Sequence, residues 1–191
     1  MTGCSPHNAL MILKPLFAGD DLPALGPEPR VGRTLLAELN RQLDSVFKKN
    51  ALSDDAQSLV RSTALLWHDY LDESHTLSQD IESADGSFLH GIMHRREPDY
   101  ANAKYWFRRV GTHPSFSEIA RRVRDLLGST NHGDLKRQLI PDGRWDAFAM
   151  VDAVESAACN RCAADYDPLL RQIQRIEFEV LLERFSAVTT H

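Results

Sequence analysis

The chain of 191 residues has few cysteines, no long apolar run and no excess of positive charge. Its cysteines are Cys4, Cys159 and Cys162, an odd number that cannot pair completely into disulfides and favours a reducing compartment. No stretch approaches the ~20 apolar residues that cross a bilayer, and the apolar run 9–13 is too short for a secretory signal. A formal charge of −5 argues against general nucleic-acid binding. We therefore expect a cytoplasmic protein whose partners include neither a nucleic acid nor a membrane.

Motifs of several common enzyme classes are also absent. The sequence contains no phosphate-binding P-loop, no dinucleotide-binding glycine fingerprint, no nucleophile elbow and no HExxH zinc signature. Cys159-Asn-Arg-Cys162 has the CxxC spacing, but it lies within a predicted helix, lacks a second pair and has no βαβ pattern around it. We interpret these thiols as buried side chains, with a redox or metal role as the alternative.

Strand patterns are nearly absent, whereas helical patterns follow one another along most of the chain. Residues 1–30 hold five of the nine prolines and are expected to form an irregular N-terminal arm over the body of the protein. Residues 31–191 are expected to form a single all-α domain, a bundle of six to eight helices. One helix is predicted over residues 53–82. Ser87 is predicted to cap the next helix, and Asp99 and Gly111 to cap the two ends of the one after it.

One segment concentrates hydrogen-bonding and ionisable side chains. Residues 86–114 read GSFLHGIMHRREPDYANAKYWFRRVGTHP and contain three of the eight histidines and four arginines. Residues 87–124 carry a net charge of +5, although the whole chain carries −5. A positive charge confined to one region suits a site for a single anion better than a field that steers large partners.

The same segment, with the preceding DESHTLSQDIES, resembles a family of uncharacterised bacterial and fungal proteins of similar length. The shared pattern is GSxxHGIMHRREPDYxNAKYWFRRVGxHP, and the resemblance covers roughly Asp72 to Pro114, about a quarter of the chain. Because no activity, cofactor or substrate is assigned to that family, the resemblance implies no catalytic residue. It implies that His75 to His113 act as one unit.

Helical projection separates candidate site residues from residues expected to be solvated. In residues 64–82, Asp69 falls on the face expected to be solvated. A polar stripe on the flank of this helix consists of His68, Asp72, His75, Gln79 and Glu82. A helix with one buried face and one solvent-exposed face does not require a third, polar stripe between them. The stripe is therefore a candidate wall of a site. A row of hydrogen bonds between helices is the alternative.

Cations on the two following helices predict an anion site. Arg96 falls within the apolar arc of its helix, and because burial of an unpaired guanidinium is costly, it should meet a carboxylate or a ligand anion. The next helix carries two polar stripes, Lys104 with Arg108 and Asn102 with Tyr105 and Arg109. The arginine fork matches carboxylate and phosphate oxygens, so the group predicts an anion clamp. Surface cations with packed stems are the alternative for Arg108 and Arg109.

A metal site is predicted on the helix that holds Arg96. His90, His94 and Glu97 lie at i, i+4 and i+7, a spacing that allows two imidazoles and a carboxylate to bind one ion. Gly91 removes a side chain beside them, which permits close approach of another backbone or a ligand. Packed or surface histidines are the alternative.

Three hypotheses about function follow. The first, which we prefer from the sequence, is a polar site between helices that binds a phosphate- or carboxylate-bearing small molecule, with His75, His90 or His94 as general acid, base or donor. Its candidate ligand-binding residues are His68, Asp72, Gln79, Arg96, Lys104, Tyr105, Arg108, Arg109 and His113. The second is a metal-dependent hydrolase that holds a divalent transition metal on His90, His94 and Glu97. The third involves no catalysis, and the polar stripes then fix helix packing or a homodimer contact. The sequence leaves open whether the protein is an enzyme.

Overall fold

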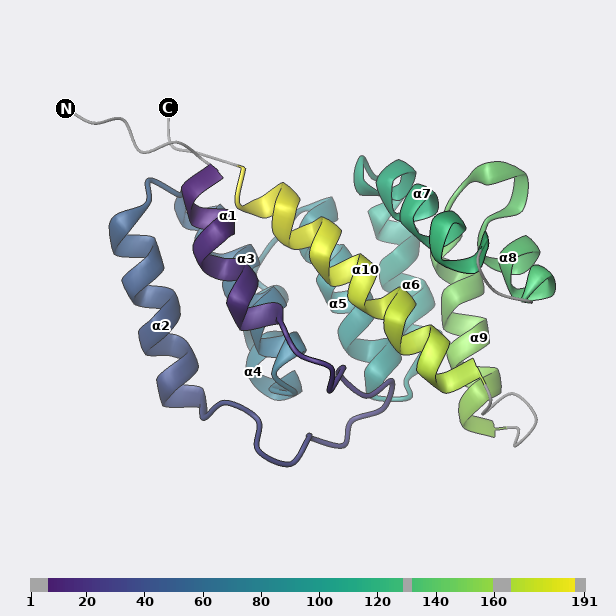
Figure 1. Cartoon of the computed structure of the whole chain (residues 1–191), viewed down its shortest axis with the longest axis horizontal. Helices are drawn as coiled ribbons and strands as arrows, with labels where there is room; N and C mark the ends of the chain where they lie inside the picture. Colours follow the sequence, from purple (N-terminus) through teal and green to yellow (C-terminus); the bar gives the residue numbers. More distant parts are fainter. Residues whose placement is uncertain (1–6, 129–131, 160–165, 188–191) are drawn as a thin grey trace.

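The computed structural model describes residues 7–128, 132–159 and 166–187, and the described residues contain ten α-helices and no strand (Figure 1). The helices are α1 (His7–Leu13), α2 (Leu36–Lys49), α3 (Asp54–Trp67), α4 (Leu71–Ser78), α5 (Ala84–Arg96), α6 (Tyr100–Val110), α7 (Ser115–Gly128), α8 (Gly133–Leu139), α9 (Ala147–Cys159) and α10 (Asp167–Phe185). Two short 3-10 helices cover Lys14–Phe17 and Pro141–Gly143. The predicted all-α class is confirmed, with more helices than the six to eight expected.

The core lies where α10 crosses the other helices. In Figure 1, α10 passes in front of α5 and α6, and it packs against α3, α7 and α9. Helix α5 packs along α6 and contacts α3 and α4. Aromatic side chains from four of these helices are buried, namely Trp67, Phe88, Phe107 and Phe178. Among the described residues, no helix combines the length and the apolarity that crossing a bilayer would require.

The single helix predicted over residues 53–82 is wrong, because the chain breaks between α3 and α4. Asp69 has a φ of 63°, in the left-handed region, which a continuous right-handed helix does not contain. Three arginines distant in sequence donate hydrogen bonds to backbone carbonyl groups at this break. Arg96 donates to the carbonyl oxygen of Leu66, Arg30 to that of Trp67, and Arg33 to that of Asp69. The break therefore depends on contacts that helical periodicity does not reveal.

Asp69 was expected to be solvated, and this is also wrong, since its side chain is fully buried. Its carboxylate accepts hydrogen bonds from Arg30 Nε at 2.7 Å and from Arg96 Nη2 at 2.7 Å. Burial opposes ionisation of this acid, but the hydrogen bonds and charge of the two guanidinium groups outweigh burial and lower the pKa of Asp69. The prediction that buried Arg96 meets a carboxylate is confirmed.

The N-terminal arm is only partly irregular. It contains α1 and a 3-10 helix, whose buried residues Ala9, Leu13 and Phe17 share one face at a spacing of four. The following segment runs without helix to α2 along the lower edge of Figure 1. Polar side chains of the body donate to its backbone: Gln174 Nε2 to Ala24 O at 3.2 Å, Arg96 to Gly26 O at 3.3 Å, and Tyr70 Oη to Thr34 O at 2.8 Å. The arm is thus tied to α5 and α10.

The start of α5 differs from the sequence prediction. Ser83, rather than Ser87, caps the helix and accepts a hydrogen bond from Gly86 N at 3.0 Å. Gly86 lies inside the helix, where a Cβ atom would collide with the backbone oxygen of Ile81. The predicted caps of α6 are confirmed: Asp99 accepts from the backbone at the start of the helix, and Gly111 ends it with a φ of 60°.

Candidate metal centre

Three histidines from two helices converge where α4 packs against α5. His75 comes from α4, and His90 and His94 lie one turn apart on α5. One ring nitrogen from each residue lies within 4.8 Å of the corresponding nitrogens of the other two. The rings of His90 and His94 are nearly parallel at 21°, and His75 meets both rings edge-on. We call these three residues the histidine cluster.

Two backbone features bring the cluster together. The break at Asp69 separates α4 from α3, and α4 packs against both α3 and α5. Gly91 permits close contact between α5 and α6, because a Cβ atom at this position would lie 2.9 Å from Phe107 Cζ. The Trp106 ring of α6 then stacks on His90, with centroids 3.9 Å apart and an interplanar angle of 11°.

His90 is the most buried member of the cluster, with 2% of its surface exposed. Its Nδ1 atom is buried and has no hydrogen-bond partner among the described residues. Burial lowers the pKa of His90 to about 3, with a further contribution from the neighbouring charges of His94, His75 and Arg109. The imidazole is therefore neutral near pH 7, with one nitrogen lone pair available. A buried polar atom without a partner is costly, and a bound ligand would remove that cost.

His94 is held by a carboxylate from its own helix. His94 Nδ1 lies 3.2 Å from Glu97 Oε2, and because a carboxylate only accepts hydrogen bonds, the proton belongs on Nδ1. Nε2 then carries the lone pair, which accepts a hydrogen bond from Asn102 Nδ2 at 3.0 Å. Burial lowers the pKa of His94, although the charge of Glu97 acts in the opposite direction. Metal-bound histidines commonly donate their second N–H to a carboxylate in this way.

The structure changes the set of ligands expected from the sequence. The spacing on one helix predicted His90, His94 and Glu97, whereas the three atoms that converge belong to His90, His94 and His75. Glu97 instead supports His94 from the side. Sequence analysis named His75 as a candidate acid or base but did not place it with the metal ligands, because it lies on a different helix.

The outer side of the cluster is lined by α6. Trp106 is half-buried against His90, and the guanidinium of Arg109 lies 5.0 Å from the centre of the Trp106 ring. Arg109 Nη1 donates to Tyr105 Oη at 3.4 Å, and both of these side chains are exposed. His75 is also half-buried. The cluster thus sits at the edge of the interior rather than deep within it.

Three predicted ligand residues lie in ion pairs elsewhere. Arg96 binds Asp69 and backbone carbonyls, as described above. Lys104 contacts Asp152 of α9 at 2.5 Å. His113 Nε2 donates to Asp85 Oδ1 at 2.8 Å while its Nδ1 accepts from a backbone N–H, and Arg184 donates to the same carboxylate.

The remaining predicted residues lie away from the cluster or on the surface. His68 Nε2 lies 2.9 Å from a carbonyl oxygen of the N-terminal arm. Asp72 and Gln79 are exposed on and beside α4, and Arg108 is exposed on α6. The two thiols of the CxxC motif were expected to be buried. This is wrong for Cys159, which is exposed, and Cys162 lies outside the described residues.

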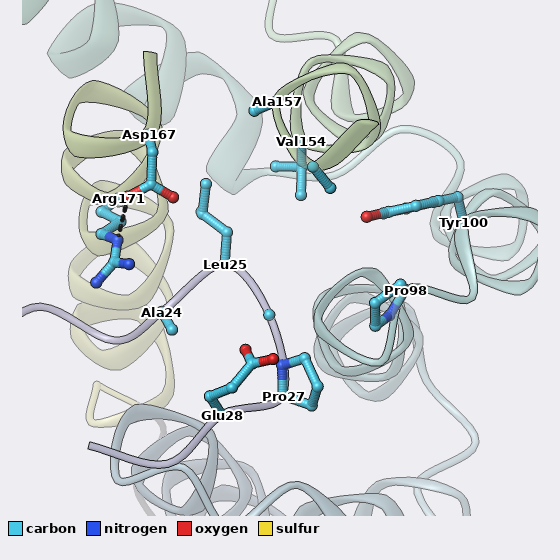
Figure 2. A pocket seen from close by; sticks show the side chains of 12 residues that line it. Ala24, Leu25, Pro27, Glu28, Pro98, Tyr100, Val154, Ala157, Asp167 and Arg171 are labelled. Atoms are coloured by element: carbon cyan, nitrogen blue, oxygen red, sulfur yellow. Dashed lines mark hydrogen bonds and ion pairs between the residues drawn. The ribbon is translucent and has the colours of Figure 1, made fainter. Parts of the chain in front are cut away.

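A separate cavity of about 260 Å³ lies between the N-terminal arm and the end of α9. In Figure 2, Leu25 of the arm stands between Tyr100 on the right and the ion pair of Asp167 with Arg171 on the left, and Glu28 lies below it. No residue of the histidine cluster lines it. Nothing in the sequence predicted this cavity, because its walls come together only when the arm docks.

Comparison of the chain with protein-family models, with curated proteins and with solved structures found no match. The chemistry of the cluster itself is therefore the basis for a functional proposal.

Proposed function

We propose that this protein binds a divalent transition-metal ion through His75, His90 and His94, and that the ion supports metal-assisted hydrolysis. The convergence of three imidazole nitrogens from two helices carries the proposal. Three protein ligands with a further position left for water is the arrangement typical of catalytic zinc sites, whereas structural zinc sites usually fill all four positions. A water bound to such an ion has a pKa of about 7 and would therefore supply a hydroxide nucleophile at neutral pH.

The dimensions of the cluster are compatible with one ion. Zinc–nitrogen bonds of ~2.0–2.1 Å in tetrahedral geometry place ligand nitrogens roughly 3.4 Å apart. The cluster nitrogens lie within 4.8 Å of one another, so small side-chain rotations would bring them to bonding distance. His94 Nε2 would exchange its hydrogen bond from Asn102 for the metal. Neutral imidazoles suit zinc, copper, nickel and iron, rather than calcium or magnesium.

The anion site that we preferred from the sequence has less support than the metal site. It required a group of free cations, and two of its members, Arg96 and Lys104, contact carboxylates of the protein. The histidine cluster, by contrast, has a buried nitrogen without a partner. We therefore favour the second sequence hypothesis, with His75 in place of Glu97.

Titration of the chelator-treated protein with Co(II) and Zn(II) tests the proposal. We expect the protein to bind one equivalent of either ion. Bound Co(II) should show the visible absorption bands that are typical of a site with a low coordination number. His75→Ala and His90→Ala should each weaken binding at least a hundredfold. Glu97→Gln should weaken binding about 10- to 100-fold, as the loss of a hydrogen-bond partner of a metal-bound histidine typically does.

His132→Ala is the matched control, because His132 is a histidine whose ring contacts Tyr166, outside the cluster. This variant should bind as the wild type does, and circular dichroism of every variant should report an intact helical fold. Failure of the folded wild type to bind one equivalent would overturn the proposal, as would equal binding by folded His75→Ala. A metal-loaded protein that hydrolyses no carboxylic or phosphoric ester would retain the site and overturn the hydrolytic function.

A further inference from the structure

Arg109 differs from most arginines of the structure in having no carboxylate partner. Arg95, Arg96, Arg122 and Arg184 each form an ion pair with an acidic side chain. Among the described residues, no acidic group lies within ion-pair distance of Arg109. Its single hydrogen bond within that part of the chain is donated by Nη1 to the Tyr105 hydroxyl at 3.4 Å. Most of its N–H donors are therefore available to a ligand.

Arg109 is nevertheless close to the histidine cluster. Its guanidinium lies over the Trp106 ring, and the same ring stacks on His90. Its charge makes the smallest of the four contributions that lower the pKa of His90. A cation beside a proposed cation site raises the energy of the occupied site unless an anion lies between or beside the two charges.

A count of charges around the occupied cluster leads to the same requirement. The three imidazoles are neutral ligands. The charges of Glu97 and Asp99 act on His94, and the charge of Arg109 acts on His90. With a divalent ion bound, two carboxylates and one guanidinium leave the site with a net positive charge. An anionic ligand from solution would neutralise it, and the arginine fork is suited to the oxygens of phosphate and carboxylate groups.

We propose that Arg109 binds the oxyanion of a small-molecule ligand whose other oxygen occupies the open position on the metal. This inference rests on the proposed function and deepens it, because it names the ligand class as phosphate- or carboxylate-bearing molecules. Arg109 is the binding residue. Trp106 holds the guanidinium beside the cluster, and Arg108, the neighbouring exposed arginine, takes no part.

The test uses the full chain loaded with Co(II), with inorganic phosphate and acetate as probes at constant ionic strength. Each probe should change the Co(II) absorption spectrum and saturate, and their relative affinities show which oxyanion the site prefers. Arg109→Gln should weaken probe binding at least tenfold, and Arg108→Gln should leave it within twofold of wild type. Arg109→Lys keeps the charge and loses the forked guanidinium, so its affinity for the probes should lie between those of the wild type and Arg109→Gln.

Co(II) affinity without a probe gives an independent readout. Arg109→Gln should bind Co(II) as tightly as the wild type or more tightly, because a neighbouring positive charge is removed. If the wild type binds no Co(II), the metal site itself fails. If it binds Co(II), but phosphate and acetate leave the spectrum unchanged or affect wild type and Arg109→Gln equally, the metal site stands and the role of Arg109 is refuted.

Discussion

Asp69→Asn tests whether the buried ion pair at the break between α3 and α4 stabilises the fold. Asparagine keeps nearly the same shape and tolerates the left-handed backbone, whose φ here is 63°. The substitution therefore removes the negative charge and leaves the geometry of the turn intact. Arg96, which is fully buried, and Arg30 would then lose their carboxylate partner.

The expected cost follows from the burial of the partners. Removing one member of a buried ion pair typically costs 3–5 kcal/mol, since the remaining charge stays buried without compensation. The asparagine amide oxygen can still accept one hydrogen bond, so we expect a loss of ~3 kcal/mol, at the lower end of that range. For a chain of this size, that corresponds to a fall in Tm of roughly 6–12 °C.

Urea unfolding followed by circular dichroism measures this loss directly. Asp80→Asn is the matched control, because Asp80 is an exposed acid just beyond α4, and it should change the free energy of unfolding by no more than ~0.5 kcal/mol. A loss below ~1 kcal/mol for Asp69→Asn would refute the argument that this carboxylate holds the break. A second variant, Asp69→Asn with Arg96→Met, should not restore stability, because Arg96 also donates to Leu66 O and Gly26 O.

Two further variants test other parts of the structure. Gly91→Ala should destabilise the protein by about 1–2 kcal/mol in urea unfolding, because crowding against Phe107 outweighs the gain in helix propensity. Gly128→Ala, which meets open space, should be neutral or stabilising, and an equal effect of both would contradict the crowding argument. Burial opposes ionisation of Asp85, but hydrogen bonds from its His and Arg partners lower its pKa. Its contribution to stability is thus complete above the unfolded pKa of about 4 and is lost as pH falls through the lower folded value. Asp85→Asn should accordingly destabilise the protein at pH 6. Between pH 4 and acid unfolding, its free energy of unfolding should fall less than that of the wild type. Parallel pH profiles of the two free energies would contradict this role of Asp85.

Local features of the fold could be predicted from the sequence, whereas features that depend on distant residues could not. The ends of α6 were predicted because Asp99 and Gly111 act on backbone groups within a few residues of themselves. The break after α3 was missed because Arg30 and Arg96, which satisfy its carbonyl groups, come from the arm and from α5. A projection at constant angle per residue cannot show such a break.

The candidate site shows the same division. His90 and His94 were found because one helical turn separates them, which places them on the same face. Their third partner, His75, lies on another helix and reaches them only through the way α4 packs on α5. The burial of Arg96 and its need for an anionic partner were predicted from its place in an apolar arc. The identity of that partner was not predicted, because Asp69 was assigned to a solvated face.

The contacts of the N-terminal arm also constrain the order of events during protein synthesis. Gln174 donates to Ala24 O across a separation of 150 residues, so the arm is made long before its binding partner on α10. Leu25, which is buried in the folded chain, lines a cavity with Asp167 and Arg171 of α10, so that cavity cannot be complete before α10 is made. Docking of the arm therefore waits for α10, and contacts of such long range form slowly. Until then the apolar side chains of the arm that become buried, Leu13, Phe17 and Leu25 among them, remain open to solvent.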